Sequence, residues 1–340
     1  MEADVDRSST LDGRIKLRDL QVLQAAAETG SMAKAAAHLA ITQPAVSYAI
    51  SELEHAVGMP LLDRSSQGVA PTVYGRALLA RSAVIFNELR SGISEIASLA
   101  NPEVGELRIG TTPPMSAVAS AVFNRLVPRY PRMRFELSVG PTDLLLRQLR
   151  QRDVEIVISR LASMAGNDDL SVETLFYDEL AVLCSKHSKW ARRRNVSLAD
   201  LVGEPWVFPP PTGFLTGIMR GAFEEQGLEF PRATVTTSCT YSLSVLVGNG
   251  NFLGIHPHAM LTMPNEHPQL TTVDVRLPTT RGAIGLISLK DRSLSPVAKL
   301  FAESATPLVQ AIQSKRPQAR RAQARMNGLP ARAIQASRIR

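Results

Sequence analysis

The sequence is poor in cysteine and has no long apolar run. Its 340 residues include only Cys184 and Cys239, which suits a reducing compartment and excludes a disulfide scaffold. No apolar stretch approaches the roughly 18 residues of a membrane-spanning helix. The first ten residues are polar and acidic, so we expect no secretory signal. We therefore predict a cytoplasmic protein without a membrane segment, with both thiols buried and inert rather than forming a redox switch.

The motifs of several enzyme classes are also missing. The chain has no GxxxxGK[ST], no GxSxG and no HExxH, and GNGNFLG follows a predicted helix instead of a strand. His256, His258 and His267 lie in a proline-rich stretch without a neighbouring cysteine, which argues against a metal site. We expect no catalytic residues, no metal and no resident cofactor.

What is present is the composition of a globular protein of about two domains. Hydrophobic residues make up 44% of the chain and charged residues 20%. The net charge of +7 has one source: residues 1–100 carry −2, residues 101–310 carry +1, and residues 311–340 carry +8. We expect residues 311–340 to be a mostly disordered basic tail, either simply solvated or weakly attracted to DNA phosphates.

Residues 17–58 carry the pattern of a helix-turn-helix. Helical spacing begins at Leu17, and Gly30 is expected to end that helix. Ser31 is then placed to cap the alanine-rich segment MAKAAAHLA, and Thr42 to cap TQPAVSYAISELEHAVG. Gly58 is expected to end the helix that Thr42 caps, which is the second helix of the helix-turn-helix.

The second helix has one short, polar and uncharged face. Gln43, Ser47 and Ser51 recur every four residues with Tyr48 beside them. Such a helix suits the major groove, where a glutamine can pair with adenine. The alternative at this point is a small helical subdomain without a role in DNA binding.

Two further elements follow the helix-turn-helix. LLDRSSQGVAPT reads as a hairpin, or wing, with Arg64 as a candidate phosphate contact. Residues 74–100 then keep an apolar stripe over about 37 Å of helix. Pairing with a second copy would cover this stripe and suit a two-fold operator, whereas packing within one chain is the alternative.

These residues resemble the DNA-binding half of the LysR-type transcriptional regulators. The resemblance lies in LRDLQVLQAAAETGSMAKAAAHLAITQPAVSYAISELEHAVGMPLLDR and VAPTVYGRALL. The family usually has Phe where Leu62 stands, and more cations on the helix and wing. The resemblance implies a homodimer or homotetramer that binds promoter DNA and meets RNA polymerase. The expected DNA contacts are Ser31, Thr42, Gln43, Pro44, Ser47, Tyr48, Ser51 and Arg64.

From Glu106 onward, strand and helix patterns alternate, which predicts βαβ units with a parallel sheet. We expect two α/β lobes joined by two crossing strands. This half resembles the periplasmic-binding-protein-like effector domain of the same family, which implies a small organic acid or sugar bound between the lobes. The effector contacts expected from matched segments are Thr111, Thr112, Met115, Ser159, Arg160, Thr212, Phe214 and His256.

The predicted fold class is therefore α/β with an all-α winged helix-turn-helix at the N-terminus. The expected domains are 15–73 for DNA binding, 74–101 for the linker helix, 105–310 for effector binding and 311–340 for the tail. Lobe I is expected at 105–184 and 283–310, and lobe II at 185–282. The competing hypothesis is a solute-binding or enzymatic α/β protein with an accessory helical domain, which would bind a ligand but not DNA. The sequence leaves open the effector, the operator and the sign of regulation.

Overall fold

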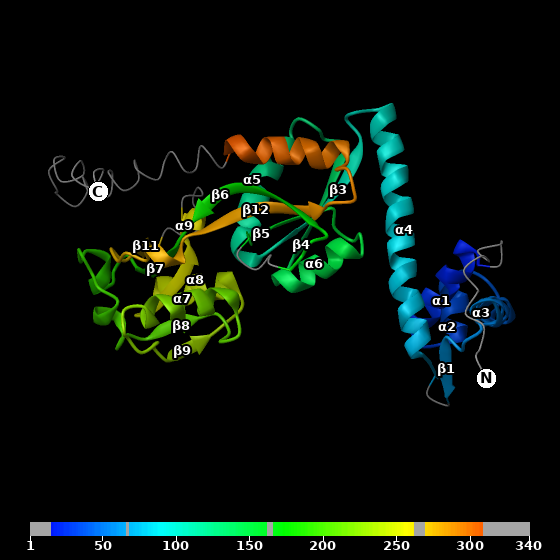
Figure 1. Cartoon of the computed structure of the whole chain (residues 1–340), viewed down its shortest axis with the longest axis horizontal. Coiled ribbons are helices and arrows are strands. Elements are labelled where there is room, and N and C mark those ends of the chain that lie inside the picture. The colour runs from blue at the N-terminus through cyan, green and yellow to red at the C-terminus, as the bar shows by residue number, and fades with distance from the viewer. Residues whose placement is uncertain (1–14, 66–67, 162–165, 262–268, 309–340) are drawn as a thin grey trace. The chain divides into compact units, whose positions relative to one another are not determined.

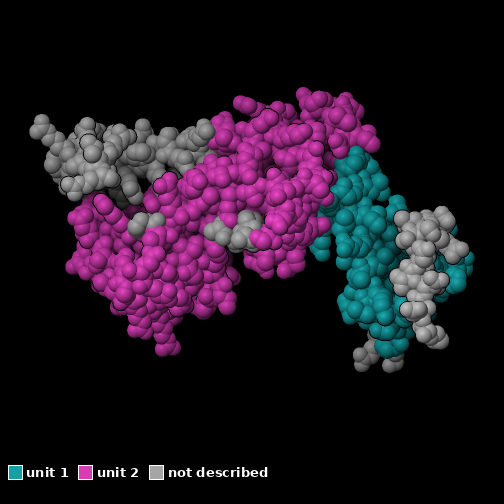
Figure 2. All heavy atoms as spheres, in the orientation of Figure 1, with its two compact units in different colours: residues 1–93, 151–153 teal, residues 94–150, 154–340 magenta. Residues whose placement is uncertain are grey.

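The chain divides into two compact units in a computed structural model that describes residues 15–65, 68–161, 166–261 and 269–308 (Figures 1 and 2). Unit 1 holds the residues up to Ile93 together with Gln151–Asp153, and unit 2 holds the rest. None of the helices within the described ranges is long and apolar enough to cross a membrane. The predicted basic tail, 311–340, and His267 lie outside the described residues.

Unit 1 begins with three short helices around one apolar core. They are α1 (Leu17–Thr29), α2 (Met32–His38) and α3 (Gln43–Val57). The expected caps are confirmed: Ser31 Oγ accepts the Lys34 amide, and Thr42 Oγ1 accepts the Ala45 amide, both at 3.4 Å. Gly30 and Gly58 end their helices with φ of +63° and +74°, which an L side chain rarely adopts.

The predicted wing is a two-stranded antiparallel sheet of β1 (Leu62–Ser65) and β2 (Gly68–Pro71). The amide of Val69 donates to the Gly30 carbonyl at 3.0 Å, which joins the wing to the end of α1. A Cβ on Gly68 would collide with that same carbonyl. The close approach of these two segments therefore requires glycine at this position.

The long helix α4 (Val73–Ala100) follows the wing and spans 28 residues, or about 42 Å. Its Asn87 is 5% exposed and donates from Nδ2 to Gln151 O and Asp153 Oδ1, at 2.9 and 2.7 Å. Arg152 adds an ion pair with Glu88 at 3.0 Å. These contacts explain why Gln151–Asp153 cluster with unit 1.

Unit 2 contains two lobes, each built on a five-stranded sheet (Figure 1). The lobe I sheet has the order β4-β3-β5-β12-β6. Its strands are β3 (Gly105–Thr111), β4 (Met133–Val139), β5 (Ile156–Arg160), β6 (Leu170–Asp178) and β12 (Gly282–Leu289).

The expected parallel sheet is wrong for part of lobe I. Strands β4, β3 and β5 are parallel, but β12 runs antiparallel to both β5 and β6. The direction of β12 differs because the chain enters this strand on its return from lobe II, and not from a helix that crosses over the lobe I sheet. Every residue of the central strand β5 is buried, as expected for a strand covered on both faces.

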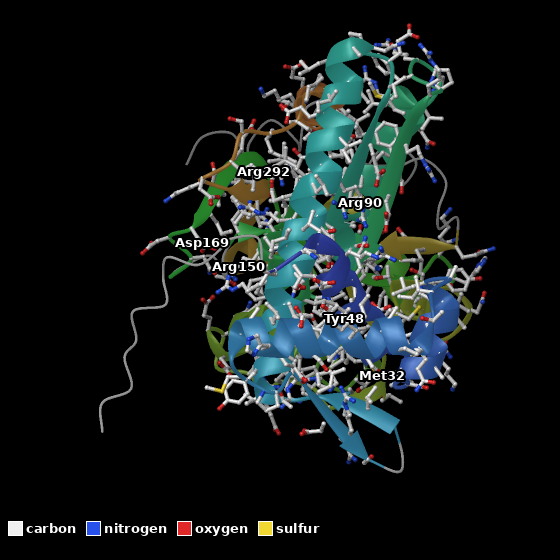
Figure 3. All side chains as sticks on the ribbon, turned by 90° about the vertical axis from the view of Figure 1, so that its right-hand side faces the viewer. Met32, Tyr48, Arg90, Arg150, Asp169 and Arg292 are labelled. Atoms are coloured by element: carbon white, nitrogen blue, oxygen red, sulfur yellow. The ribbon has the colours of Figure 1, made fainter. Side chains whose placement is uncertain are left out.

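Helices cover both faces of the lobe I sheet. One core contains residues of α5 (Ser116–Leu126) and of the helical segment 296–308, including Val122 and Phe301. The other contains α6 (Thr142–Arg150), with Leu145 and Leu149 fully buried or nearly so. At the surface, Arg150 holds Asp169 through two hydrogen bonds of 2.7 and 2.9 Å (Figure 3), which lower the pKa of that carboxyl.

The lobe II sheet has the order β11-β7-β10-β8-β9. Its strands are β7 (Leu180–Ser185), β8 (Trp206–Phe208), β9 (Ala233–Thr236), β10 (Leu253–Pro257) and β11 (Leu270–Thr272). The sequence assigned residues 180–184 to lobe I, but β7 pairs with β10 and β11 and so belongs to lobe II. The chain therefore crosses between lobes at about residue 179.

Two helices and several short turns complete lobe II. Helix α7 (Phe214–Glu224) packs on Trp206 and Phe208, and α8 (Thr240–Asn249) covers the opposite face. The rings of Trp206 and Phe208 stack at 4.8 Å. The short elements of unit 2 are η1 (Pro113–Met115), η3 (Lys189–Ala191), η4 (Ala199–Leu201), α9 (His258–Leu261) and η5 (Pro278–Thr280).

Candidate DNA-binding surface and effector site

Helix α3 presents a polar face to solvent. Gln43 and Ser51 are exposed, Ser47 is half-buried, and Tyr48 is 68% exposed (Figure 3). The opposite face is buried, because Val46, Ile50 and Leu53 have no exposed surface. Core packing therefore fixes the rotation of the helix and leaves the side chains predicted to read DNA free to contact a partner.

The remaining residues predicted on the helix-turn-helix lie at helix starts. The side chains of Ser31 and Thr42 cap α2 and α3, and Pro44 is exposed in the first turn of α3. Proline is tolerated there because its missing N–H has no partner within the helix. Thr42 and Pro44 therefore mark where the polar face of α3 begins, and Ser31 marks the start of α2.

Arg64 is exposed on β1 of the wing, a different element from the polar face of α3.

Glu54 on α3 links this helix to the wing, a contact that the sequence did not predict. Its Oε1 accepts the amides of Leu61 and Leu62 at 2.8 and 3.2 Å, so it anchors the wing to the recognition helix. A glutamate just before the Gly58–Pro60 break was the available signal.

The residues predicted to bind an effector lie around the junction of the two lobes, with very different exposure. Thr111 and Met115 are buried, and Thr111 Oγ1 donates to the Ile158 carbonyl at 3.3 Å. Thr112 is half-buried and precedes η1. The expected anion site at this helix start has few donors, because Pro113 and Pro114 lack N–H groups and the Met115 amide donates to Thr112 O.

Ser159 and Arg160 end β5 and are both buried. The Ser159 hydroxyl lies 3.0 Å from Thr142 Oγ1, a pair that the sequence reasoning missed because Thr142 begins a different element. The Arg160 guanidinium donates from Nη1 to Thr280 O at 2.8 Å and from Nη2 to Asp178 O at 3.2 Å. Burial lowers the pKa of Arg160 below its usual range, and the nearby Asp178 charge partly offsets that effect.

In lobe II, Thr212 is exposed and Phe214, the first residue of α7, is 44% exposed. His256 is only 4% exposed, because it lies within β10 rather than after it. Among the predicted effector residues, Thr112, Thr212 and Phe214 therefore offer surface to a ligand. The other five, Thr111, Met115, Ser159, Arg160 and His256, are buried.

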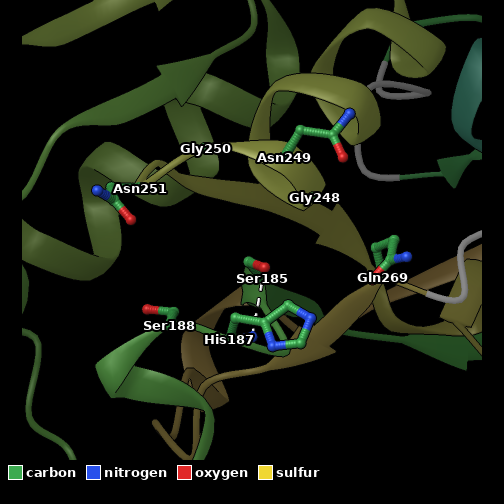
Figure 4. A pocket seen from close by; sticks show the side chains of 8 residues that line it. All are labelled: Ser185, His187, Ser188, Gly248, Asn249, Gly250, Asn251 and Gln269. Carbon is green, nitrogen blue, oxygen red and sulfur yellow. Dashed lines mark hydrogen bonds between the residues drawn. The ribbon is translucent and has the colours of Figure 1, made fainter.

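A separate polar cavity of about 330 Å³ lies at the other end of the lobe II sheet (Figure 4). It is lined by Ser185 at the end of β7, by the residues that end α8, and by Gln269 before β11. None of the predicted effector residues is among its lining residues. The lobe crossing lies at the opposite end of this sheet, where Leu180 begins β7 and pairs with Pro257, the last residue of β10. The cavity is therefore distinct from the predicted effector site.

The two cysteines differ in exposure. Cys184 is buried as expected, and its pKa rises to about 12. The prediction that Cys239 is buried is wrong: it caps α8 at the surface, beyond the last residue of β9. A hydrogen bond with Ser242 lowers its pKa. Among the described residues, no group of three His, Cys, Asp or Glu side chains could hold a metal ion.

A winged helix-turn-helix with a polar recognition helix, followed by a long helix and a two-lobed α/β half, defines the class of ligand-responsive DNA-binding regulators. Residues 17–76 match the family "Bacterial regulatory helix-turn-helix protein, lysR family", and residues 100–309 match "LysR substrate binding domain". The chain belongs to the LysR family of transcriptional regulators, whose members are not enzymes.

Individual relatives are similar over most of the chain. The HTH-type transcriptional regulator GbpR of Azospirillum brasilense is 26% identical, with 90% of this chain and 92% of the relative covered. GbpR of Rhizobium radiobacter is 32% identical over 68% of this chain and 78% of the relative. The full-length CbnR structure solved with its target DNA has a TM-score of 0.67 at 20% identity, covering 86% of this chain and 99% of CbnR.

Proposed function

We propose that this regulator binds a two-fold operator as a homodimer or homotetramer in the cytoplasm and meets RNA polymerase at the promoter. The observation that carries the DNA-reading role is the exposed polar face of α3, which follows a capped helix start. Gln43 would pair with a base edge, Ser47 and Ser51 would hydrogen-bond nearby, and Tyr48 would reach sugar or phosphate. Ser31 at the start of α2, and Thr42 and Pro44 at the start of α3, would contact the DNA backbone and so position the helices. Arg64 would reach a DNA phosphate from the wing.

The surface of α4 supports the pairing of two copies. Its apolar residues Leu89, Ile93 and Ile96 are between 49% and 69% exposed. An exposed apolar stripe of this length is costly in water and suits coiled-coil contact with a second α4. Two recognition helices would then lie on neighbouring half-sites of the operator.

The lobe junction would take a small organic acid or sugar. The hydroxyl groups of Thr112, Thr212 and the half-buried Thr142 would supply hydrogen bonds, with the buried Ser159 holding Thr142 in place, and the exposed Phe214 ring would supply an apolar face. Thr111, Met115, Arg160 and His256 would complete the walls. An effector acts on DNA binding only through its different affinity for two arrangements of the protein.

The test is DNase footprinting on the intergenic DNA upstream of the protein's own gene, with excess nonspecific competitor. A protected, two-fold-related site is expected for the full chain. Gln43→Ala should weaken this footprint, whereas Gln21→Ala, which removes an exposed glutamine from α1, should leave it unchanged. Small acids and sugars can then be screened by their effect on the same footprint.

Two results would contradict the proposal. Equal footprints for the wild type and Gln43→Ala would remove Gln43 from the reading surface. Diffuse binding that disappears with added salt would reject sequence-specific recognition and favour the solute-binding alternative.

A further inference from the structure

We propose that Arg160 is a positioning residue that ties together the two chain crossings between the lobes and thereby sets how the lobes are oriented. The chain leaves lobe I after β6 and returns to it through β12. These two crossings are the only covalent links between the lobe sheets within the described residues of unit 2. A side chain that holds both crossings controls the region about which the lobes would move.

The two crossings already contact each other through their backbones. Asp178, the last residue of β6, pairs with Gly282, the first residue of β12. Just beyond, Thr280 Oγ1 accepts the Leu180 amide at 3.0 Å and donates to the Leu277 carbonyl at 2.7 Å. Thr280 thus ties the returning crossing to the start of the first lobe II strand.

Arg160 reaches this point from the end of β5 and binds one carbonyl on each crossing. Its Nη1 donates to Thr280 O and its Nη2 to Asp178 O, at 2.8 and 3.2 Å. The side chain is buried, with 6% of the residue exposed. A planar guanidinium holds two acceptors in a fixed geometry, which a flexible or apolar side chain cannot do.

The surroundings of the guanidinium are built to admit it. A Cβ on Gly282 would lie 2.5 Å from Arg160 Nη1, so glycine leaves the space that the guanidinium fills. The Asp178 carboxylate, 1% exposed, balances the positive charge and also accepts the Ala259 amide at 3.1 and 3.2 Å. Ala259 lies in α9, directly after β10 of lobe II, and packs into the lobe I core, so one connected network joins β5 and both crossings to the chain that leaves β10.

Losing the guanidinium would leave buried carbonyls and a buried carboxylate without these partners. Such groups regain partners by admitting water, which separates the two crossings. We therefore expect the lobes to sample a wider range of orientations without loss of structure inside either lobe. This inference concerns the geometry of the lobes and does not depend on the identity of the effector.

The test measures distances between the lobes by pulsed electron paramagnetic resonance on the full chain. One spin label attaches to the exposed native Cys239 in lobe II, and a second to Val139→Cys at the end of β4 in lobe I. Buried Cys184 stays unlabelled. Labelled protein is diluted with unlabelled protein so that distances within one chain dominate.

Arg160→Met and Gly282→Ala should each broaden the distance distribution between the lobes relative to the wild type. Gly282→Ala keeps every polar group and displaces only the guanidinium, so it tests the idea even where Arg160→Met fails to fold. Arg134→Met, on the exposed side of β4, is the matched control and should keep the wild-type distribution.

A second label pair separates positioning from general loosening. Cys239 with Arg192→Cys reports a distance within lobe II, and this distribution should stay as sharp in the variants as in the wild type. Unchanged distances between the lobes in folded Arg160→Met and Gly282→Ala would overturn the proposal. Equal broadening within lobe II would also overturn it, because Arg160 would then support the lobe fold itself.

Discussion

Single polar side chains join elements that lie far apart in the sequence. Glu54 connects the recognition helix to the wing, Asn87 connects α4 to the turn at 151–153, and Arg160 connects β5 to both lobe crossings. Each of these side chains is at least partly buried and satisfies backbone groups that no regular ladder reaches. Burial also sets the chemical reactivity of the two thiols, because Cys184 is buried and Cys239 is exposed.

The first prediction concerns these thiols. Reaction with a disulfide reagent near neutral pH should label one cysteine quickly in the folded protein and both after denaturation. The hydrogen bond from Ser242 stabilises the Cys239 thiolate, so the labelling rate should rise at a lower pH than for free cysteine. Ser242→Ala should move this rise to higher pH.

Cys239→Ser should abolish the fast reaction, and Cys184→Ser should leave its rate unchanged as the matched control. Fast labelling of two thiols in the folded state would contradict the burial of Cys184 and its raised pKa of about 12.

At the scale of whole elements, amphipathic helices explain both the core of unit 1 and the surface of α4. Helices α1 and α3 bury one stripe each against a shared core. Helix α4 contributes Leu78 and Phe86 to that core, but its later apolar residues remain exposed. Residues 93–99 therefore carry apolar surface that the chain itself does not cover in the part that the structure describes.

Replacing Ile93 with lysine should weaken self-association. Ile93 is 62% exposed at the middle of the stripe, so a charge there would be desolvated between two copies while costing the lone chain little. Sedimentation velocity should show a shift toward smaller species for Ile93→Lys. Glu95→Lys changes the charge beside the stripe and should keep the wild-type distribution. A dimer that survives Ile93→Lys undiminished would place the interface elsewhere.

At the scale of the whole molecule, charge is distributed unevenly along the chain. The regions 1–100 and 101–310 are nearly neutral, while residues 311–340 carry +8. Attraction to DNA phosphates scales with the number of cations near the duplex and falls with salt. The proposed reading of the operator by α3 and an attraction of the tail to phosphates would therefore be separable properties.

Deleting residues 311–340 leaves a chain with a net charge of −1. Fluorescence anisotropy with a scrambled duplex should show weaker binding and a shallower dependence on salt than for the full chain. The operator footprint should persist, because α3 and the wing remain. A full-length variant in which glutamine replaces the eight cations of the tail is the matched control, because it removes the charge and keeps the length. An unchanged salt dependence would show that the tail does not contact DNA.

Local patterns in the sequence were sufficient to predict the helices and the wing of unit 1. The helix caps at Ser31 and Thr42, the glycine ends at Gly30 and Gly58, and the wing hairpin all depend on residues a few positions apart. Local patterns also predicted most helices and strands of unit 2, because hydrophobic periodicity is a property of consecutive residues.

The arrangement of unit 2 depended on contacts that no local pattern encodes. The direction of β12, the place of β7 in lobe II and the exposure of Cys239 follow from pairing and packing between distant segments. Arg160 is the clearest case: its sequence context suggested a ligand contact, yet its guanidinium meets Thr280, which is 120 residues away. Periodicity orients each segment toward a core, but only the folded chain brings the partners of a buried charge together.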